Sequence, residues 1–161
     1  MIPLNEEISE LLEKAKINAI KFLSYRPRSE KEVKDFLFKK KFSENIISQT
    51  LNFLKEHKLV DDIEFAKWWI EQRQEFKAKS KFIIKQELLF KGVAKEVIEN
   101  ILEKSLGDFE VALALFEKNM RKFKNYKGQE LFNKAASFLQ RKGFKWEVIE
   151  KILKKCKIER S

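Results

Sequence analysis

The sequence predicts an all-α protein made of three tandem three-helix repeats, and three observations lead to that prediction. The block Phe42-Ser43-Glu44-Asn45-Ile46-Ile47 recurs in character at 93–98 and 144–149, each time 51 residues further along the chain. Only four glycines and two prolines interrupt a chain rich in Lys, Glu, Leu and Ile. Apolar residues follow helical spacing. Three stacked helical units indicate an elongated array with a binding surface, rather than a catalytic pocket.

Residues 1–59 are assigned to an N-terminal lead and the first repeat. An apolar stripe with spacing i, i+3, i+4, i+7 predicts a first helix over residues 8–23. This helix ends before Pro27, because a proline disfavours helical geometry in the residue that precedes it. Ser29 and Glu32 then have the spacing of a capping box, which predicts that the second helix begins there.

A left-handed turn is predicted after the second helix of the repeats. Gly92 and Gly143 occupy equivalent places after that helix, where glycine avoids the steric cost of a Cβ atom. Lys41 stands at the equivalent place in the first repeat, so we expect that turn to be strained or reshaped. Ser43 follows as the expected N-cap of the third helix.

Residues 60–106 are assigned to the second repeat. Asp61 or Asp62 is expected to cap its first helix, because a side-chain oxygen just before a helix accepts hydrogen bonds from the first free N–H groups. Ser80 is expected to begin its second helix in the same way.

Residues 107–161 are assigned to the third repeat and a basic C-terminal tail. The helices of this repeat are predicted from Asp108 and the apolar stripe over 109–123, from a second stripe over 131–139, and from a third over 148–153.

The formal net charge of +10 lies mainly at the C-terminal end. Residues 1–60 carry +3, residues 61–107 carry 0 and residues 108–161 carry +7. Such an excess favours encounters with polyanions, whether nucleic acid or the acidic surface of a nucleoprotein. Solubility alone is the competing interpretation of the charge.

Features typical of enzymes, metal sites and membrane proteins are sparse in the sequence. No apolar run reaches the length of a membrane span and no secretory signal is recognisable, so we expect a cytoplasmic protein without a membrane partner. Cys156 is the only cysteine, which leaves no internal disulfide and no thiolate metal cluster. His57, the only histidine, lies at a predicted helix end and suits a capping or solvated role. We expect no enzymatic activity, no catalytic residues, no cofactor and no metal, although a site built from Asp and Glu stays open.

Cationic residues cluster at the junction between the first and second helices of each repeat. The contact candidates are Arg26 and Arg28 in the first repeat; Arg73, Lys77, Lys79, Lys81 and Lys85 in the second; and Lys118, Arg121, Lys122, Lys124 and Lys127 in the third. Stacked repeats would place three such patches along one side of the array. Phe123 and Tyr126 lie among the last group, and aromatic residues among cations can stack on unpaired bases. Ordinary lysines at helix ends would give the same pattern.

Glu87 departs from the apolar pattern, because its equivalents in the other two repeats are Phe36 and Phe138. A carboxylate at a core-facing position needs a partner. We expect Arg73 or Lys85 to provide it, and we favour this structural role over that of a catalytic acid.

Four segments in the right order and spacing resemble the RecX family, the regulators of the RecA recombinase. They are Arg26-Pro27-Arg28-Ser29-Glu30-Lys31-Glu32, Asp61-Asp62-Ile63-Glu64-Phe65-Ala66, Gln86-Glu87-Leu88-Leu89-Phe90-Lys91-Gly92-Val93 and Arg141-Lys142-Gly143-Phe144. The resemblance runs from about Ala15 to Leu153, and Lys41 in place of a glycine is a departure from it. It implies three three-helix repeats in a curved, all-helical molecule. It also implies binding in the groove of the RecA filament on single-stranded DNA, with inhibition of ATP hydrolysis and strand exchange and no catalysis by the regulator itself.

The resemblance and the charge together predict a monomer that binds the RecA filament and binds single-stranded DNA only weakly by itself. A direct nucleic-acid-binding protein is the alternative, because three-helix units with basic second and third helices also resemble helix-turn-helix modules. A purely structural scaffold is a third interpretation, and it would bind neither DNA nor the filament.

Overall fold

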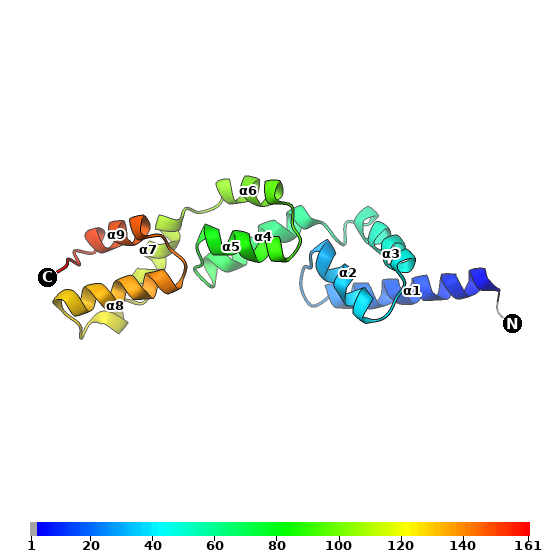
Figure 1. The fold of residues 1–161 in the computed structure, drawn as a ribbon, viewed down its shortest axis with the longest axis horizontal. Helices are drawn as coiled ribbons and strands as arrows, with labels where there is room; N and C mark the ends of the chain where they lie inside the picture. The colour runs from blue at the N-terminus through cyan, green and yellow to red at the C-terminus, as the bar shows by residue number, and fades with distance from the viewer. Residues whose placement is uncertain (1–2) are drawn as a thin grey trace. The chain divides into compact units, whose positions relative to one another are not determined.

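A computed structural model describes residues 3–161, in which nine α-helices and one short 3-10 helix are present and no strand occurs (Figure 1). The helices are α1 (Leu4–Leu23), α2 (Glu30–Lys39), α3 (Glu44–Glu56), α4 (Asp62–Glu75), α5 (Lys81–Phe90), α6 (Lys95–Glu103), α7 (Asp108–Lys118), η1 (Met120–Phe123), α8 (Gly128–Arg141) and α9 (Trp146–Lys155). The predicted all-α fold with three three-helix repeats is therefore confirmed.

The chain forms two compact units. One unit contains the chain up to Trp68 together with Leu88–Ile98, and the other contains Trp69–Glu87 together with Glu99–Ser161. The boundaries cut α4, α5 and α6, so the middle repeat contributes to both units. Each unit has a hydrophobic core of its own.

Small residues allow the helices of the first unit to approach closely. Ala15 and Ala19 of α1 are fully buried, and α1, α2 and α3 pack against one another. Leu37 from α2 and Leu54 from α3 fill the space between these helices and are fully buried. The predicted stripe is thus the core face of α1 from Leu12 onward, whereas Ile8 and Leu11 are 38% and 47% exposed and lie outside the core. Burial of the core side chains stabilises the bundle.

The second unit differs from the prediction at the end of α7. The stripe over 109–123 predicts one helix, but α7 ends at Lys118 and η1 follows from Met120 to Phe123. The tighter turn brings the ring of Phe123 within 5.3 Å of Phe116 and 5.5 Å of Phe138, measured between centroids. Burial of Phe123 between α7 and α8 explains why the helix does not continue.

Four predicted helix caps are confirmed. Ser29 and Glu32 form both hydrogen bonds of the capping box at α2. The side chains of Ser43 and Ser80 accept hydrogen bonds from backbone N–H groups in the first turns of α3 and α5. At α4 the cap is Asp61, whose Oδ1 accepts from the Ile63 N–H at 2.9 Å.

Asp62 and Asp108 each begin one helix but accept a hydrogen bond from the start of another. Oδ1 of Asp62 accepts the backbone N–H of Glu30 at 2.9 Å, and Oδ1 of Asp108 accepts that of Lys81 at 2.8 Å. Each aspartate therefore satisfies a free N–H at the start of the second helix of the preceding repeat. This contact joins consecutive repeats in the same way at both places.

The predicted left-handed turns recur after α2, α5 and α8, with φ of 67° at Lys41, 80° at Gly92 and 86° at Gly143. A Cβ atom at Gly92 would lie only 2.7 Å from Cβ of Lys31, and one at Gly143 would collide with Ile83. These two turns thus need glycine both for backbone conformation and for close approach. Lys41 is exposed and keeps only the conformational strain.

Hydrogen bonds hold the glycine turns against the capping serines of the preceding repeat. Oγ of Ser29 donates to the carbonyl oxygen of Lys91 at 2.7 Å, and the N–H of Ser80 donates to the carbonyl oxygen of Lys142 at 3.4 Å. The same pair of positions, 51 residues apart, is used at both junctions.

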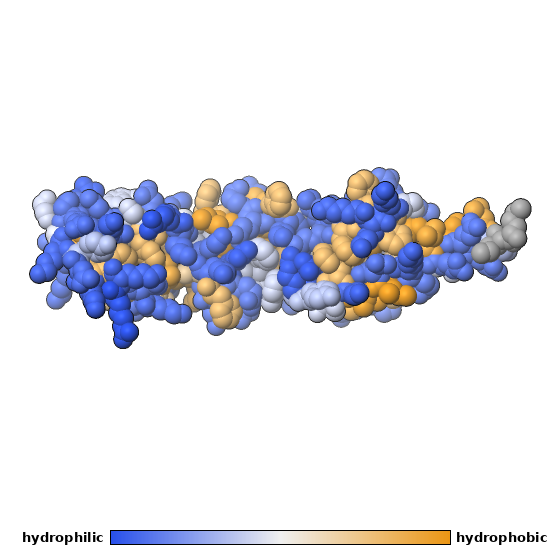
Figure 2. All heavy atoms as spheres, turned by 90° about the horizontal axis from the view of Figure 1, so that it is seen from below, coloured by the Kyte–Doolittle hydropathy of each residue, from blue (hydrophilic) through white to orange (hydrophobic). Residues whose placement is uncertain are grey.

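Hydrophilic side chains cover most of the face seen in Figure 2, and hydrophobic side chains gather in separate patches, one of them along α1. Leu4 and Ile17 of that helix are 71% and 66% exposed. Within residues 3–161, no helix combines the length and the apolar character that a membrane span requires.

Gly143→Ala and Gly92→Ala should each lower the free energy of unfolding by about 1–3 kcal/mol, because the new methyl group meets both a left-handed backbone and a packed neighbour. Urea denaturation followed by circular dichroism measures the change. Gly107→Ala is the control, since the φ of Gly107 is −70° and its Cβ would meet only the flexible end of Glu110. Equal losses in all three variants would contradict this explanation.

Asp62→Asn should leave the unfolding free energy at pH 7 equal to or above that of the wild type, whereas Asp62→Ala should lower it by about 1 kcal/mol. Burial raises the pKa of Asp62 above its ordinary value of 3.8, even though the Glu30 N–H favours the charged form. The folded state therefore binds this proton more tightly than the unfolded state, and the contribution of Asp62 falls as the pH rises. The advantage of the Asn variant should shrink toward pH 4; an advantage that grows there would contradict the assignment.

Candidate functional site

The arginines of the first cluster make contacts within the first unit. Arg26 donates hydrogen bonds to both carboxylate oxygens of Glu32, at 2.6 and 3.2 Å, and Lys91 approaches the same carboxylate at 2.5 Å. Burial alone would raise the pKa of Glu32, but hydrogen bonds from Arg26, Lys91 and the Ser29 N–H outweigh it and lower the pKa. The guanidinium of Arg28 lies 3.9 Å from the ring centroid of Phe22. Both arginines therefore stabilise the connection between α1 and α2.

Glu87 is the centre of the second cluster. Its Oε2 accepts a hydrogen bond from Nε1 of Trp69 at 2.9 Å, and its Oε1 accepts one from Nζ of Lys79 at 2.9 Å. Nε of Arg73 lies 3.0 Å from Oε2 but outside hydrogen-bond geometry, so that contact is an ion pair. The expected Arg73 partner is confirmed, whereas Lys85 instead pairs with Glu99 at 2.7 Å.

The positions equivalent to Glu87 in the other two repeats, Phe36 and Phe138, also lie beside a cation. In the first repeat Nζ of Lys40 lies 5.7 Å from the ring centroid of Phe36, and in the third Nζ of Lys122 lies 5.6 Å from that of Phe138. A cation thus faces this position in every repeat, over an aromatic ring twice and beside a carboxylate once. The carboxylate neutralises cations that would otherwise be available to a partner.

Two further lysines of the second cluster differ in exposure. Nζ of Lys81 donates to the carbonyl oxygen of Leu102 at 2.5 Å, near the end of α6, which satisfies a free carbonyl there. Lys77 is exposed and forms no ion pair with another described residue. The second cluster therefore offers little free positive charge beyond Lys77.

The third cluster is different, because all of its cations are exposed and none forms an ion pair with the described residues. They extend from the end of α7 through η1 to the start of α8. We call these residues the basic segment: Lys118, Arg121, Lys122, Lys124 and Lys127. A segment of this kind presents its charge to a partner without breaking an internal ion pair.

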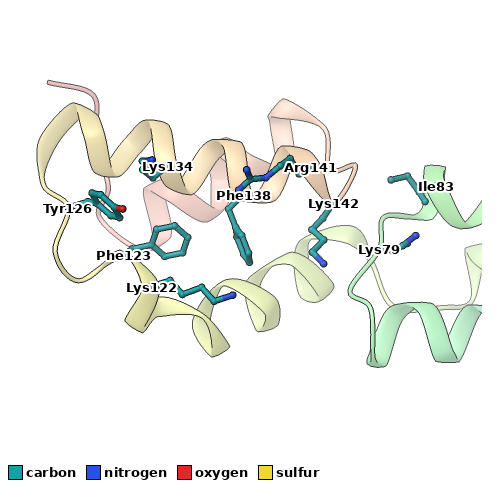
Figure 3. Close-up of a pocket in the computed structure, with 9 residues that line it drawn as sticks. All are labelled: Lys79, Ile83, Lys122, Phe123, Tyr126, Lys134, Phe138, Arg141 and Lys142. Atoms are coloured by element: carbon teal, nitrogen blue, oxygen red, sulfur yellow. The ribbon is translucent and has the colours of Figure 1, made fainter.

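A groove of about 590 Å³ lies beside the basic segment, within the second unit (Figure 3). It brings together Lys79 from the loop before α5, Lys122 from η1, and side chains of α8. We call it the cationic groove, and its lining residues are Lys79, Ile83, Lys122, Phe123, Tyr126, Lys134, Phe138, Arg141 and Lys142. No carboxylate lines it.

Lys134, Arg141 and Lys142 were not predicted as contact residues from the sequence. The signal was present, because Lys134, Phe138 and Arg141 have i, i+4, i+7 spacing and share one face of α8. The same helix also carries an apolar face with the buried Ala135 and Leu139, and this stronger pattern predicts only a helix packed on the core.

Glu87→Ala should lower the unfolding free energy by about 1–2 kcal/mol, because it leaves the guanidinium of Arg73 half-buried without its counter-ion. Glu87→Phe should lose less, since a lysine can then cover the ring as Lys122 covers Phe138. Glu99→Ala is the control, because it breaks the more exposed Lys85 ion pair and should cost under about 1 kcal/mol. Chemical denaturation measures all three; an alanine variant at position 87 as stable as wild type would contradict this role.

Three family models match the chain consecutively: the first RecX three-helix domain at residues 15–54, the second at 61–102 and the third at 107–153. The regulatory protein RecX of Bacillus pumilus is 34% identical over 152 residues, covering 93% of this chain and 58% of that protein. The regulatory protein RecX of a Geobacillus species is 41% identical over 137 residues, covering 84% and 51%. The chain thus spans little more than half of the length of these two relatives.

Solved structures agree with the sequence matches. The crystal structure of RecX from Lactobacillus salivarius superposes with a TM-score of 0.77 at 26% identity, and the match covers 91% of this chain and 97% of that one. A second crystal structure, of a regulatory protein RecX, gives a TM-score of 0.74 at 26% identity and covers 91% and 73%.

Proposed function

This chain belongs to the RecX family of regulatory proteins, and from that membership we propose that it binds the RecA filament on single-stranded DNA and inhibits ATP hydrolysis and strand exchange. In this proposal it acts as a cytoplasmic monomer, without catalysis, cofactor or metal. It thereby modulates homologous recombination and DNA repair.

The observation that carries this proposal is the exposed basic segment. A RecA filament on DNA offers phosphates and acidic protein surface together, and exposed cations are attracted to both. In the other two clusters Arg26 pairs with Glu32, Arg73 and Lys79 pair with Glu87, and Lys85 pairs with Glu99, so most of that charge is neutralised within the protein. The third repeat is therefore the proposed contact surface.

Binding alone is sufficient for the proposed inhibition. A helical array that touches more than one filament subunit resists the relative movements that accompany hydrolysis and growth. The binding free energy then opposes those movements, and no residue of the regulator has to take part in chemistry.

ATP hydrolysis by the cognate RecA on single-stranded DNA tests the proposal. Inhibition is expected at fewer than one molecule of this protein per RecA subunit, and below the amount that coats the DNA. No inhibition by a folded protein that binds the DNA tightly would overturn the proposal.

The triple variant Arg121→Glu, Lys122→Glu and Lys124→Glu should require at least about 10-fold more protein for the same inhibition, because it reverses the charge of the basic segment. The matched control is Lys14→Glu, Lys21→Glu and Lys39→Glu, which changes the net charge equally at exposed sites of the first repeat. Circular dichroism checks that both variants fold. Equal loss of inhibition in both would show that only the net charge matters.

A second candidate function is direct binding of nucleic acid, and the cationic groove favours it. A sequence-selective reader would bind bare DNA tightly, with affinity falling steeply as salt increases. A regulator directed to the filament would bind bare DNA weakly and the filament strongly. Titration of both targets in one buffer separates the two functions.

A further inference from the structure

We propose that the cationic groove is a binding site for single-stranded nucleic acid, in which the phosphodiester lies among the groove cations and an unpaired base stacks on Tyr126 or Phe138. The site is argued from its own geometry and does not depend on RecA. It goes further than the second candidate function above, because it specifies an unpaired strand as the ligand and assigns the contact residues.

The charge of the groove points to an anionic ligand. Five of its nine lining residues are cations, and none is acidic. Lys79 alone is neutralised, by Oε1 of Glu87 at 2.9 Å. Lys122, Lys134, Arg141 and Lys142 form no ion pair with the described residues, so an incoming phosphate does not have to displace a carboxylate from them.

Two of these lysines lie over aromatic rings. Nζ of Lys134 lies 5.4 Å from the ring centroid of Tyr126, and Nζ of Lys122 lies 5.6 Å from that of Phe138. An exposed contact between a cation and a ring contributes about 0.5–1 kcal/mol, whereas a hydrogen bond to a charged group contributes about 1.5–3 kcal/mol. A phosphate should therefore draw each ammonium group off its ring, and the uncovered face becomes available to a base.

The aromatic rings distinguish an unpaired strand from other polyanions. Each base of a single strand has a free face that can stack on tyrosine or phenylalanine, whereas the bases of a duplex are already stacked. An acidic peptide would use the cations but leave the rings unused. A volume of about 590 Å³ lies within the usual range of sites for small ligands, and a nucleotide is a ligand of that size.

The arrangement in Figure 3 fits a strand whose phosphates contact the cations and whose base stacks on a ring. The rings of Phe123 and Phe138 lie in the middle of the view, Tyr126 and Lys134 lie toward one end, and Lys142 and Lys79 lie toward the other. Phosphates can thus be held on both sides of a stacked base, with the strand running along the groove.

Fluorescence anisotropy of a labelled oligo(dT), without RecA, tests the site. Tyr126→Leu should raise the Kd for the single strand about 5-fold or more, the lower range of stacking contributions, and should change duplex binding less than 2-fold. Tyr126→Phe keeps the ring and should bind within 2-fold of wild type. A Leu variant that binds oligo(dT) like the wild type, or that loses duplex binding equally, would overturn the proposal.

The double variant Lys134→Gln and Arg141→Gln tests the charge independently. It should reduce the slope of log K against log salt by about 1.4, because about 0.7 is expected for each single-strand phosphate contact. Lys151→Gln with Lys154→Gln removes equal charge from exposed sites of α9 outside the groove and should leave the slope nearly unchanged. Equal slopes in the two double variants would overturn the site. That result would leave filament regulation standing, since RecA is absent from the assay.

Discussion

The contact that joins one repeat to the next is the constraint on which the rest of the structure depends. At each junction the turn after the second helix packs on the capping serine of the preceding repeat, and only glycine fits that turn. Asp62 and Asp108 close the same junctions by accepting an N–H from the second helix of the preceding repeat. The two junctions thus use equivalent positions, although Ser29 donates through its side chain and Ser80 through its backbone N–H.

The junctions also decide which cations are available to a partner. Arg26 and Lys91 pair with Glu32, and Arg73 and Lys79 pair with Glu87, so their charge contributes to folding. The basic segment has no such carboxylate, and α8 adds further cations beside it. A family fold with repeated architecture can therefore concentrate its attraction for polyanions in one repeat. In the proposed function this concentration directs the third repeat to the filament.

Local signals in the sequence predict the helical repeats, apart from the break between α7 and η1. The caps at Ser29, Ser43 and Asp61 and the turn at Gly92 depend on residues within one turn of a helix, and each was predicted correctly. Contacts between distant segments are harder to predict, because the spacing of residues in the sequence does not show which segments meet. For example, Asp62 accepts a hydrogen bond from the N–H of Glu30, which lies 32 residues earlier in the sequence. The sequence predicts three equivalent basic patches, because it does not show that Glu32 and Glu87 pair with cations of the first and second clusters.

Hydrogen–deuterium exchange of this protein, free and bound to the RecA filament on single-stranded DNA, tests the central claim most directly. The account predicts added protection over residues 118–142, which contain the basic segment and the α8 side of the cationic groove, with smaller changes in α1 and α3. Protection confined to the first repeat, with residues 118–142 unchanged in the complex, would contradict it.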